Sequence, residues 1–170
     1  MALLKRLIAG AALVLVLGTG TRAATVDVGE GVPDVTLRDW HGGRAAISER
    51  RGRVVLIDFW ASWCAMCRTA LPALDAIARR HPSVDVLAVS IDGDRGAAER
   101  FLAERLPDTA MTLLHDPDGD VFARFGASGM PALYLIDAEG VVRLVESGYV
   151  PDRLADVERE LERLLSGEKR

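Results

Sequence analysis

The feature that most constrains the fold of this 170-residue chain is residues 54–60 (VVLIDFW), a largely apolar run that leads toward its only two cysteines. Such a run, rich in β-branched and aromatic side chains, is typical of a strand that is buried on both faces. Beyond Cys64, apolar side chains recur at three- and four-residue steps over residues 71–78, which is the periodicity of a helix. The sequence therefore predicts a buried strand followed by a helix, with Cys64 and Cys67 at the junction.

The rest of the chain alternates apolar runs with amphipathic segments, without an internal repeat or a low-complexity linker. The predicted strands cover residues 35–37, 45–47, 84–91, 111–114, 132–136 and 141–145, and the further predicted helices cover residues 95–106, 119–125 and 152–165. Turn signals at residues 41–43 (HGG) and 137–140 (DAEG) predict two hairpins. This order of elements indicates one α/β domain with a mixed sheet, which we place at residues 25–170.

Residues 1–23 have the composition of an export signal. A Lys-Arg pair lies near its start, residues 7–17 (LIAGAALVLVL) are an apolar run, and small residues close it. The run is shorter than the roughly 20 apolar residues that a helix needs to cross a bilayer. It therefore favours a signal peptide. An uncleaved N-terminal membrane anchor, extended through residues 18–20, is the alternative, and both interpretations place the domain outside the cytoplasm, where disulfides persist.

Composition limits the classes of protein that the chain can belong to. Hydrophobic residues make up 49% of the sequence and charged residues 27%, a balance that argues against intrinsic disorder. The formal net charge is −4 and the sequence contains no basic run. Because proteins that bind nucleic acids usually carry a basic face, we expect no nucleic-acid partner.

The two cysteines are predicted to be chemical rather than structural, because a disulfide that closes so small a loop removes little chain entropy. The N-terminus of a helix presents unsatisfied N–H groups and about half a positive charge, which favours the thiolate at Cys64. Cys67 lies about one turn later, within reach of a mixed disulfide on Cys64. The spacing therefore predicts Cys64 as the nucleophile and Cys67 as the resolving thiol.

Two metal-binding interpretations compete with this one. A structural zinc site needs four ligands, and the sequence has no second Cys pair or His pair at ligand spacing, so we predict no metal site. A Cu(I)-binding chaperone that uses the same two cysteines is the alternative function, because Met66 adds a soft sulfur between them. Titration with Cu(I) against an insulin-reduction assay separates a chaperone from a redox enzyme.

Residues 58–68 (DFWASWCAMCR) resemble the active-site segment of the thioredoxin superfamily. Pro72 matches its helix proline, and Met130-Pro131 before an apolar strand matches its cis-proline. The hairpin near residues 35–47 is similar to that of the branch that includes TlpA, ResA and DsbE, which are exported thiol–disulfide oxidoreductases. The resemblance covers about residues 29–165 and implies a thioredoxin-like fold: a central mixed sheet flanked by helices, with an N-terminal β-hairpin extension.

The resemblance also assigns roles to individual residues. Cys64 matches the exposed nucleophile and Cys67 the buried resolving thiol of the family. Trp63 matches the tryptophan that flanks them, and Pro131 the proline after a cis peptide bond, which leaves the backbone of Met130 free to pair with a substrate strand. Trp63, Met130 and Pro131 are therefore the expected substrate-binding residues.

Asp58 matches the buried acid behind the dithiol, and a carboxyl group on a buried strand should have a raised pKa and relay a proton to or from the resolving thiol. The sequence departs from the family in its other polar groups. Ala70 stands where many members of the branch have a glutamate, and Ala88 stands where thioredoxin has a lysine. Asp58 is therefore the only acid expected near the dithiol.

The dipeptide Ala65-Met66 adds no positive charge between the cysteines. We therefore predict a reductant with a potential nearer that of thioredoxin, about −270 mV, than that of the oxidant DsbA. An enzyme that inserts disulfides is the weaker alternative. The resemblance implies a periplasmic enzyme without a cofactor, which reduces disulfides of exported proteins such as apocytochrome c or respiratory copper-site proteins. A membrane thiol carrier is the expected electron donor.

Overall fold

The computed structural model describes residues 25–148 and 151–167, and the predicted signal segment at residues 1–23 lies outside them. The strands are β1 (Thr36–Asp39), β2 (Arg44–Ala46), β3 (Val55–Trp60), β4 (Asp85–Ser90), β5 (Thr112–His115), β6 (Ala132–Ile136) and β7 (Val142–Ser147). The helices are α1 (Ala65–Arg80), α2 (Arg95–Arg105), α3 (Asp120–Arg124) and α4 (Pro151–Leu165), with a 3₁₀ helix at Ile47–Arg50. Within these described ranges, none of the helices is long and apolar enough to cross a membrane.

β3, the run that the sequence marked as buried, is an interior strand of the sheet, between β4 and β6. The strand order is β2-β1-β5-β4-β3-β6-β7, and β3 pairs in parallel with β4 and antiparallel with β6. All six residues of β3 are buried, because helices or loops cover both faces of the sheet there. The predicted thioredoxin-like mixed sheet is confirmed.

The N-terminal hairpin is part of the central sheet and not a separate flap. β1 pairs antiparallel with β5, with Arg38 opposite His115, so the hairpin covers the edge of β5. The turn between β1 and β2 uses Gly42 at φ +87°, and the Asp39 carboxylate accepts hydrogen bonds from the backbone N–H groups of His41 and Gly43. The hairpin extension was predicted, whereas its pairing with β5 was not.

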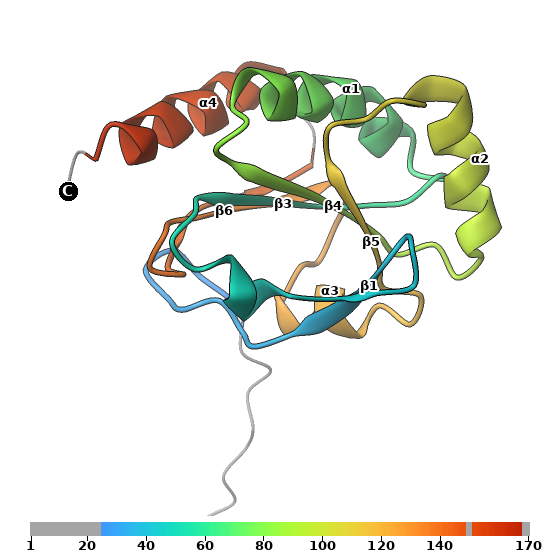
Figure 1. Cartoon of the computed structure of the whole chain (residues 1–170), viewed down its shortest axis with the longest axis horizontal. Helices are drawn as coiled ribbons and strands as arrows, with labels where there is room; N and C mark the ends of the chain where they lie inside the picture. The colour runs from blue at the N-terminus through green and yellow to red at the C-terminus, as the bar shows by residue number, and fades with distance from the viewer. Residues whose placement is uncertain (1–24, 149–150, 168–170) are drawn as a thin grey trace, which may run out of the picture.

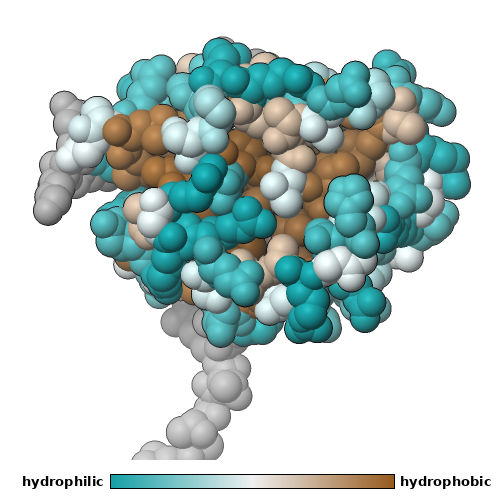
Figure 2. Space-filling model, in the orientation of Figure 1, coloured by the Kyte–Doolittle hydropathy of each residue, from teal (hydrophilic) through white to brown (hydrophobic). Residues whose placement is uncertain are grey.

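Helices α1, α2 and α4 lie on one face of the sheet, and α3 and the 3₁₀ helix lie on the other (Figure 1). The outward surface of the α1 and α4 layer is largely hydrophilic (Figure 2). Side chains of β3 alternate between the two apolar cores: Leu56 and Trp60 join the core under α1, and Phe59 joins the core on the other side. This alternation directs Asp58 toward the face that α1 covers.

Several element boundaries differ by one or two residues from the sequence-based expectation. His115, one residue beyond the strand predicted at residues 111–114, is the last residue of β5, because its backbone pairs with Arg38 on one side and Ser90 on the other. β7 runs to Ser147, two residues beyond the predicted strand. Helix α1 continues through Pro72 as one element.

Candidate active site

The two cysteines lie where β3 ends and α1 begins. Cys64 is the N-cap of α1, and its backbone N–H donates a hydrogen bond to the Ala61 carbonyl at 3.1 Å. Cys64 and Cys67 form a disulfide with Cα atoms 5.3 Å apart, and the Cys64 Sγ accepts a hydrogen bond from the Cys67 backbone N–H at 3.1 Å. Cys64 is half-buried and Cys67 is fully buried. A partner can therefore reach the pair only from the Cys64 side.

The start of α1 is an electropositive environment for Cys64. The helix has 16 residues, and its first turn contains no acidic side chain to cancel the positive end of the helix dipole. The Cys67 N–H points at the Cys64 sulfur in the oxidised pair. We expect the same N–H and the dipole to favour the thiolate over the thiol at Cys64 after reduction.

Asp58 lies on the strand behind the cysteines. It is 0% exposed, and neither of its carboxylate oxygens has a hydrogen-bond partner among the described residues. Burial raises the pKa of Asp58 to about 8, because the charged form has lost its hydration. Asp58 shares the α1-facing side of the sheet with Cys67, which belongs to the same apolar core as Leu56 and Trp60. The carboxyl group can therefore hold or release a proton close to neutral pH.

The loop before β6 contributes the third part of the site. The Met130–Pro131 peptide bond is cis, as the resemblance implied. Pro131 is buried, while Met130 is half-buried and packs against the same core as Cys64. The Pro131 carbonyl accepts a hydrogen bond from the Gly148 backbone N–H at 2.8 Å, which ties this loop to the end of β7.

Two exposed apolar side chains flank the disulfide. Trp63 is 66% exposed and Met66 is 46% exposed. A Cβ atom placed on Gly148 would lie 3.7 Å from the Met66 Cε, so Met66 extends toward the end of β7. Sequence reasoning missed Gly148, because no local pattern indicates a contact between Met66 and a glycine so far along the chain.

A second missed group lies beside the site, in the loop that follows β4. Asp92 is 2% exposed, and its carboxylate accepts hydrogen bonds from the backbone N–H and the hydroxyl of Ser62 at 2.9 and 2.7 Å. A sequence signal was available, because the carboxyl ends of the parallel strands β3 and β4 meet at one edge of the sheet. An aspartate just after the second strand therefore lies near the loop that follows the first.

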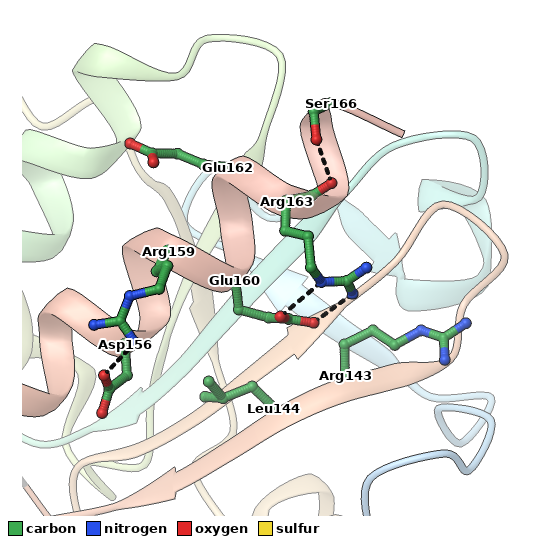
Figure 3. Close-up of a pocket in the computed structure, with 8 residues that line it drawn as sticks. All are labelled: Arg143, Leu144, Asp156, Arg159, Glu160, Glu162, Arg163 and Ser166. Carbon is green, nitrogen blue, oxygen red and sulfur yellow. Dashed lines mark hydrogen bonds and ion pairs between the residues drawn. The ribbon is translucent and has the colours of Figure 1, made fainter. Parts of the chain in front are cut away.

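The described residues contain no cluster of three or more His, Cys, Asp or Glu side chains that could hold a metal ion. A charged groove lies between β7 and α4 (Figure 3). Its lining residues are Arg143, Leu144, Asp156, Arg159, Glu160, Glu162, Arg163 and Ser166. Its three arginines are paired with carboxylates: Arg159 with Asp156, Arg163 with Glu160, and Arg143 with Asp137. The lining residues belong to β7, α4 and the residue after α4, and none of them comes from the segments that carry Cys64, Cys67 and the cis-proline.

A thioredoxin-like sheet, a Cys-x-x-Cys disulfide at a helix N-terminus and a buried acid behind it define a thiol–disulfide oxidoreductase. The comparison with known families agrees. The chain belongs to the AhpC/TSA family, whose model matches residues 28–145.

Individual relatives narrow the class. The thiol-disulfide oxidoreductase ResA of Geobacillus kaustophilus is 30% identical over 144 residues, which cover 84% of this chain and 80% of the relative. The thiol:disulfide interchange protein DsbE of Pseudomonas fluorescens is 31% identical over 117 residues, or 68% of this chain and 64% of the relative. A crystal structure from Chlorobium tepidum, assigned as a DsbE, superposes with a TM-score of 0.78 at 33% identity and covers 83% of this chain and 99% of that one. The protein is a thiol–disulfide oxidoreductase of the ResA and DsbE type.

Proposed function

We propose that the protein is an extracytoplasmic reductant of disulfides in partner proteins, with Cys64 as the attacking sulfur and Cys67 as the resolving one. The observation that carries the proposal is the asymmetry of the pair. Cys64 is half-exposed at the N-cap of α1, whereas its bonded partner Cys67 is fully buried. Only one of the two sulfurs can meet a bulky substrate first.

The reaction begins from the dithiol. The Cys64 thiolate attacks one sulfur of the partner disulfide, so a mixed disulfide forms and the other partner sulfur leaves and takes up a proton. The Cys67 thiol then loses its proton, and its thiolate attacks the Cys64 sulfur. The mixed disulfide breaks, the second partner thiol is released, and the Cys64–Cys67 disulfide forms. Two electrons pass to the partner, and an external dithiol must return the pair to its reduced state.

Asp58 is the proposed proton relay for the second step. The pKa of Asp58, which burial raises to about 8, allows its carboxyl group to accept or donate a proton close to neutral pH. Its position on the α1-facing side of β3 supports transfer to or from Cys67, whose side chain is buried in the core on that side.

Trp63, Met130 and Pro131 are the proposed substrate-binding residues. The exposed ring of Trp63 and the neighbouring Met66 offer apolar contact area next to the reactive sulfur. The cis-proline loop is held against the end of β7 by the hydrogen bond from Gly148 to Pro131. An extended segment of a partner protein fits this combination, because its backbone can pair with Met130 while its side chains contact Trp63 and Met66.

We propose that the protein reduces partner disulfides and does not insert them, because Ala65 and Met66 add no positive charge between the cysteines. The proposed compartment is the periplasm, reached through the segment at residues 1–23 as a signal peptide or a membrane anchor. The proposed partners are exported proteins whose cysteine pairs must be reduced, with apocytochrome c and respiratory copper-site proteins as the first candidates. A membrane thiol carrier is the proposed electron donor.

The test combines covalent capture of the partner protein on Cys64 with a measurement of the redox potential of the Cys64–Cys67 pair. A Cys67→Ser variant retains Cys64 and should hold its partner as a mixed disulfide that dithiothreitol releases. A Cys64→Ser, Cys67→Ser double variant is the matched control and should capture nothing. Equilibration of the wild-type protein with glutathione buffers should give a potential near about −270 mV, and a value above roughly −170 mV would contradict the assignment as a reductant.

A further inference from the structure

We propose that Asp92 is a positioning residue for disulfide exchange: by binding Ser62, it fixes the loop that presents Trp63 and Cys64 at the start of α1. The inference deepens the proposed function and rests on it, because it takes Cys64 as the attacking sulfur. Asp92 lies outside the Cys-x-x-Cys segment and the cis-proline loop, in the connection between β4 and α2.

The Asp92 carboxylate joins two segments. Its Oδ2 accepts hydrogen bonds from the Ser62 backbone N–H and from the Ser90 hydroxyl, both at 2.9 Å. Its Oδ1 accepts a hydrogen bond from the Ser62 hydroxyl at 2.7 Å. Two of these three bonds therefore reach the residue two positions before Cys64, and bonds to an ionised acceptor are the stronger kind.

These bonds continue the link between β3 and β4 beyond the end of the sheet. Trp60 lies opposite Ser90 in the parallel pair, and the Ile91 backbone N–H donates to the Trp60 carbonyl at 2.9 Å. Beyond this point the two segments diverge: the segment after β3 leads to α1, and the segment after β4 leads to α2. The hydrogen bonds between Asp92 and Ser62 join the two segments again, two residues beyond the ends of β3 and β4, at the base of the loop that carries the reactive cysteine.

Asp92 is itself held from the β5 side. His115 Nε2 lies 2.7 Å from the Asp92 carbonyl oxygen, and the Asp92 backbone N–H donates to the Ser90 hydroxyl at 3.1 Å. The ring of Trp40, in the turn after β1, packs against the ring of His115 at 6.0 Å. Because the aspartate is fixed by the sheet, it can impose a position on the cysteine loop instead of following the loop.

If Asp92 acted on Cys64 only through its negative charge, its loss would change the reactivity of Cys64 in the opposite direction from the loss of a positioning contact. A carboxylate near Cys64 disfavours the thiolate, so its removal would make Cys64 more reactive at neutral pH. If Asp92 holds the loop in place, its loss should displace Cys64 from the N-cap position of α1. Cys64 then loses its favourable contact with the helix terminus and becomes less reactive. The two explanations therefore differ in sign.

Substitution of Asp92 by asparagine distinguishes the effect of its hydrogen bonds from the effect of its negative charge. In Asp92→Asn, an amide oxygen placed where Oδ2 lies can accept from Ser62 N–H and the Ser90 hydroxyl, and the amide NH₂ can donate to the Ser62 hydroxyl oxygen. This variant keeps the three contacts without the negative charge. Asp92→Ala removes both the contacts and the charge, and Ser62→Ala removes only the hydroxyl contact.

The experiment measures the pH dependence of Cys64 alkylation by iodoacetamide in the reduced full-length protein, with the labelled residue identified by mass spectrometry. Asp92→Ala should slow the reaction at pH 7 by about three- to tenfold and raise the apparent pKa of Cys64. Ser62→Ala should change both in the same direction by a smaller factor. Asp92→Asn should stay within about twofold of the wild-type rate, since the contacts persist.

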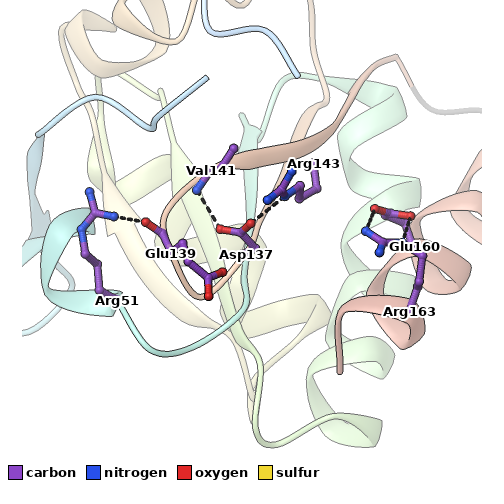
Figure 4. A network of polar contacts seen from close by, with 7 residues as sticks. All are labelled: Arg51, Asp137, Glu139, Val141, Arg143, Glu160 and Arg163. Carbon is purple, nitrogen blue, oxygen red and sulfur yellow. Dashed lines mark hydrogen bonds and ion pairs between the residues drawn. The ribbon is translucent and has the colours of Figure 1, made fainter. Parts of the chain in front are cut away.

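The matched control is Asp137→Ala. Asp137 is also an almost fully buried aspartate, and its carboxylate accepts bonds from the Val141 N–H and from Arg143 (Figure 4). It follows β6 beside the start of β3, at the opposite end of the sheet from Cys64, because Ile136 pairs with Val55. Loss of Asp137 should lower the stability of the fold and leave the alkylation profile of Cys64 unchanged.

An unchanged profile in Asp92→Ala, or faster alkylation in both Asp92 variants, overturns the positioning role. If Asp92→Ala does not fold, Ser62→Ala and Asp92→Asn decide the question: wild-type behaviour in Ser62→Ala, or a slow reaction in Asp92→Asn, overturns the role as well. Failure of the wild-type protein to reduce insulin, with Cys64 no more reactive than free cysteine, would defeat the proposed function instead. A reactive wild type with unaltered Asp92 variants defeats only this inference.

Discussion

Asp58 on β3 and Ala88 on β4 are direct partners in adjacent parallel strands. Because paired residues of neighbouring strands point to the same face, the side chain next to the Asp58 carboxyl group on that side is a methyl group. Leu133 is the partner on the β6 side, so Asp58 is flanked by apolar residues in both directions. Burial in these surroundings raises the pKa of Asp58 to about 8.

This pKa makes the stability of the fold depend on pH. An unfolded aspartate titrates near pH 3.9, so between about pH 4 and pH 8 the folded carboxyl group keeps a proton that the unfolded chain releases. Asp58 therefore lowers the free energy of unfolding progressively as the pH rises through this window, by about 1 kcal/mol per pH unit. Asp58→Asn cannot titrate and should lose less stability between pH 5 and pH 8. Urea unfolding of the two oxidised proteins at both pH values measures the difference, and parallel pH profiles would contradict the raised pKa.

The same substitution tests the proton relay. Asp58→Asn should slow the displacement of the partner by Cys67 by about a hundredfold, because general acid–base catalysis is worth at least that factor in many enzymes. Attack by Cys64 should change little, so the mixed disulfide should accumulate. Rapid quenching of a single turnover, followed by mass spectrometry, detects that species. A mixed disulfide that decays at the wild-type rate would remove Asp58 from the mechanism.

Much of this site could be predicted from sequence because it is built from neighbours in the chain. The run that forms β3, the junction with α1 and the placement of Cys64 and Cys67 follow from hydrophobic pattern and spacing within residues 54–80. The fold class followed from the order of such elements together with the family resemblance.

Contacts between distant segments could not be predicted in this way. The pairing of β1 with β5 depends on which sheet edge is free, and this is a property of the assembled sheet. The same pairing places His115 in a strand, although its own neighbours Asp116 and Pro117 indicate a loop. The bonds between Asp92 and Ser62 likewise need the two strand ends to be adjacent first.

Asp75 provides a test of stability that is separate from the chemistry. Burial alone would raise the pKa of Asp75, but hydrogen bonds from the Thr109 hydroxyl, the Ala110 N–H and Arg79 outweigh it and lower the pKa below its ordinary value. The stabilisation is therefore present above the pKa of an unfolded aspartate, about 3.9, and is lost as the pH falls through the lower folded pKa.

Asp75→Ala should lower the free energy of unfolding by about 1–3 kcal/mol at pH 7, since it leaves the Ala110 N–H and the Thr109 hydroxyl without the carboxylate that accepts from them. The difference from the wild type should shrink as the pH falls below about 3.9. Glu99→Ala is the control: it removes an exposed pair with Arg95 on α2 and should cost no more than about 0.5 kcal/mol. Denaturant unfolding at pH 7 and pH 3 measures both, and an Asp75→Ala difference that is constant with pH would refute the linkage.

The apolar rim around the disulfide should matter for protein substrates and not for small ones. Trp63→Ala removes an exposed ring beside Cys64 and should raise the KM for a protein disulfide by about tenfold, the size of effect that aromatic anchors show in interfaces. Reduction of a small aromatic disulfide should keep its wild-type rate. Val28→Ala is the matched control, because Val28 is 56% exposed but precedes Gly29, which bonds to Val142 at the far end of β7. Equal losses on both substrates would assign Trp63 to the chemistry of Cys64 instead of to partner binding.

If the positive end of α1 favours the Cys64 thiolate, as we propose, a charge at the first helical residue should shift the redox potential of the pair. Ala65 is that residue and is exposed. Ala65→Lys should stabilise the Cys64 thiolate and therefore the reduced form, which raises the potential by about 10–20 mV.

Ala65→Glu should lower the potential by a similar amount, because a negative charge near Cys64 disfavours its thiolate. Ala65→Gln is the neutral control and should leave the potential in place. Equilibration of each variant with a series of glutathione buffers, followed by alkylation and mass spectrometry, gives the three values. If lysine and glutamate shift the potential in the same direction, the electrostatics of the helix terminus do not control the redox balance of the Cys64–Cys67 pair.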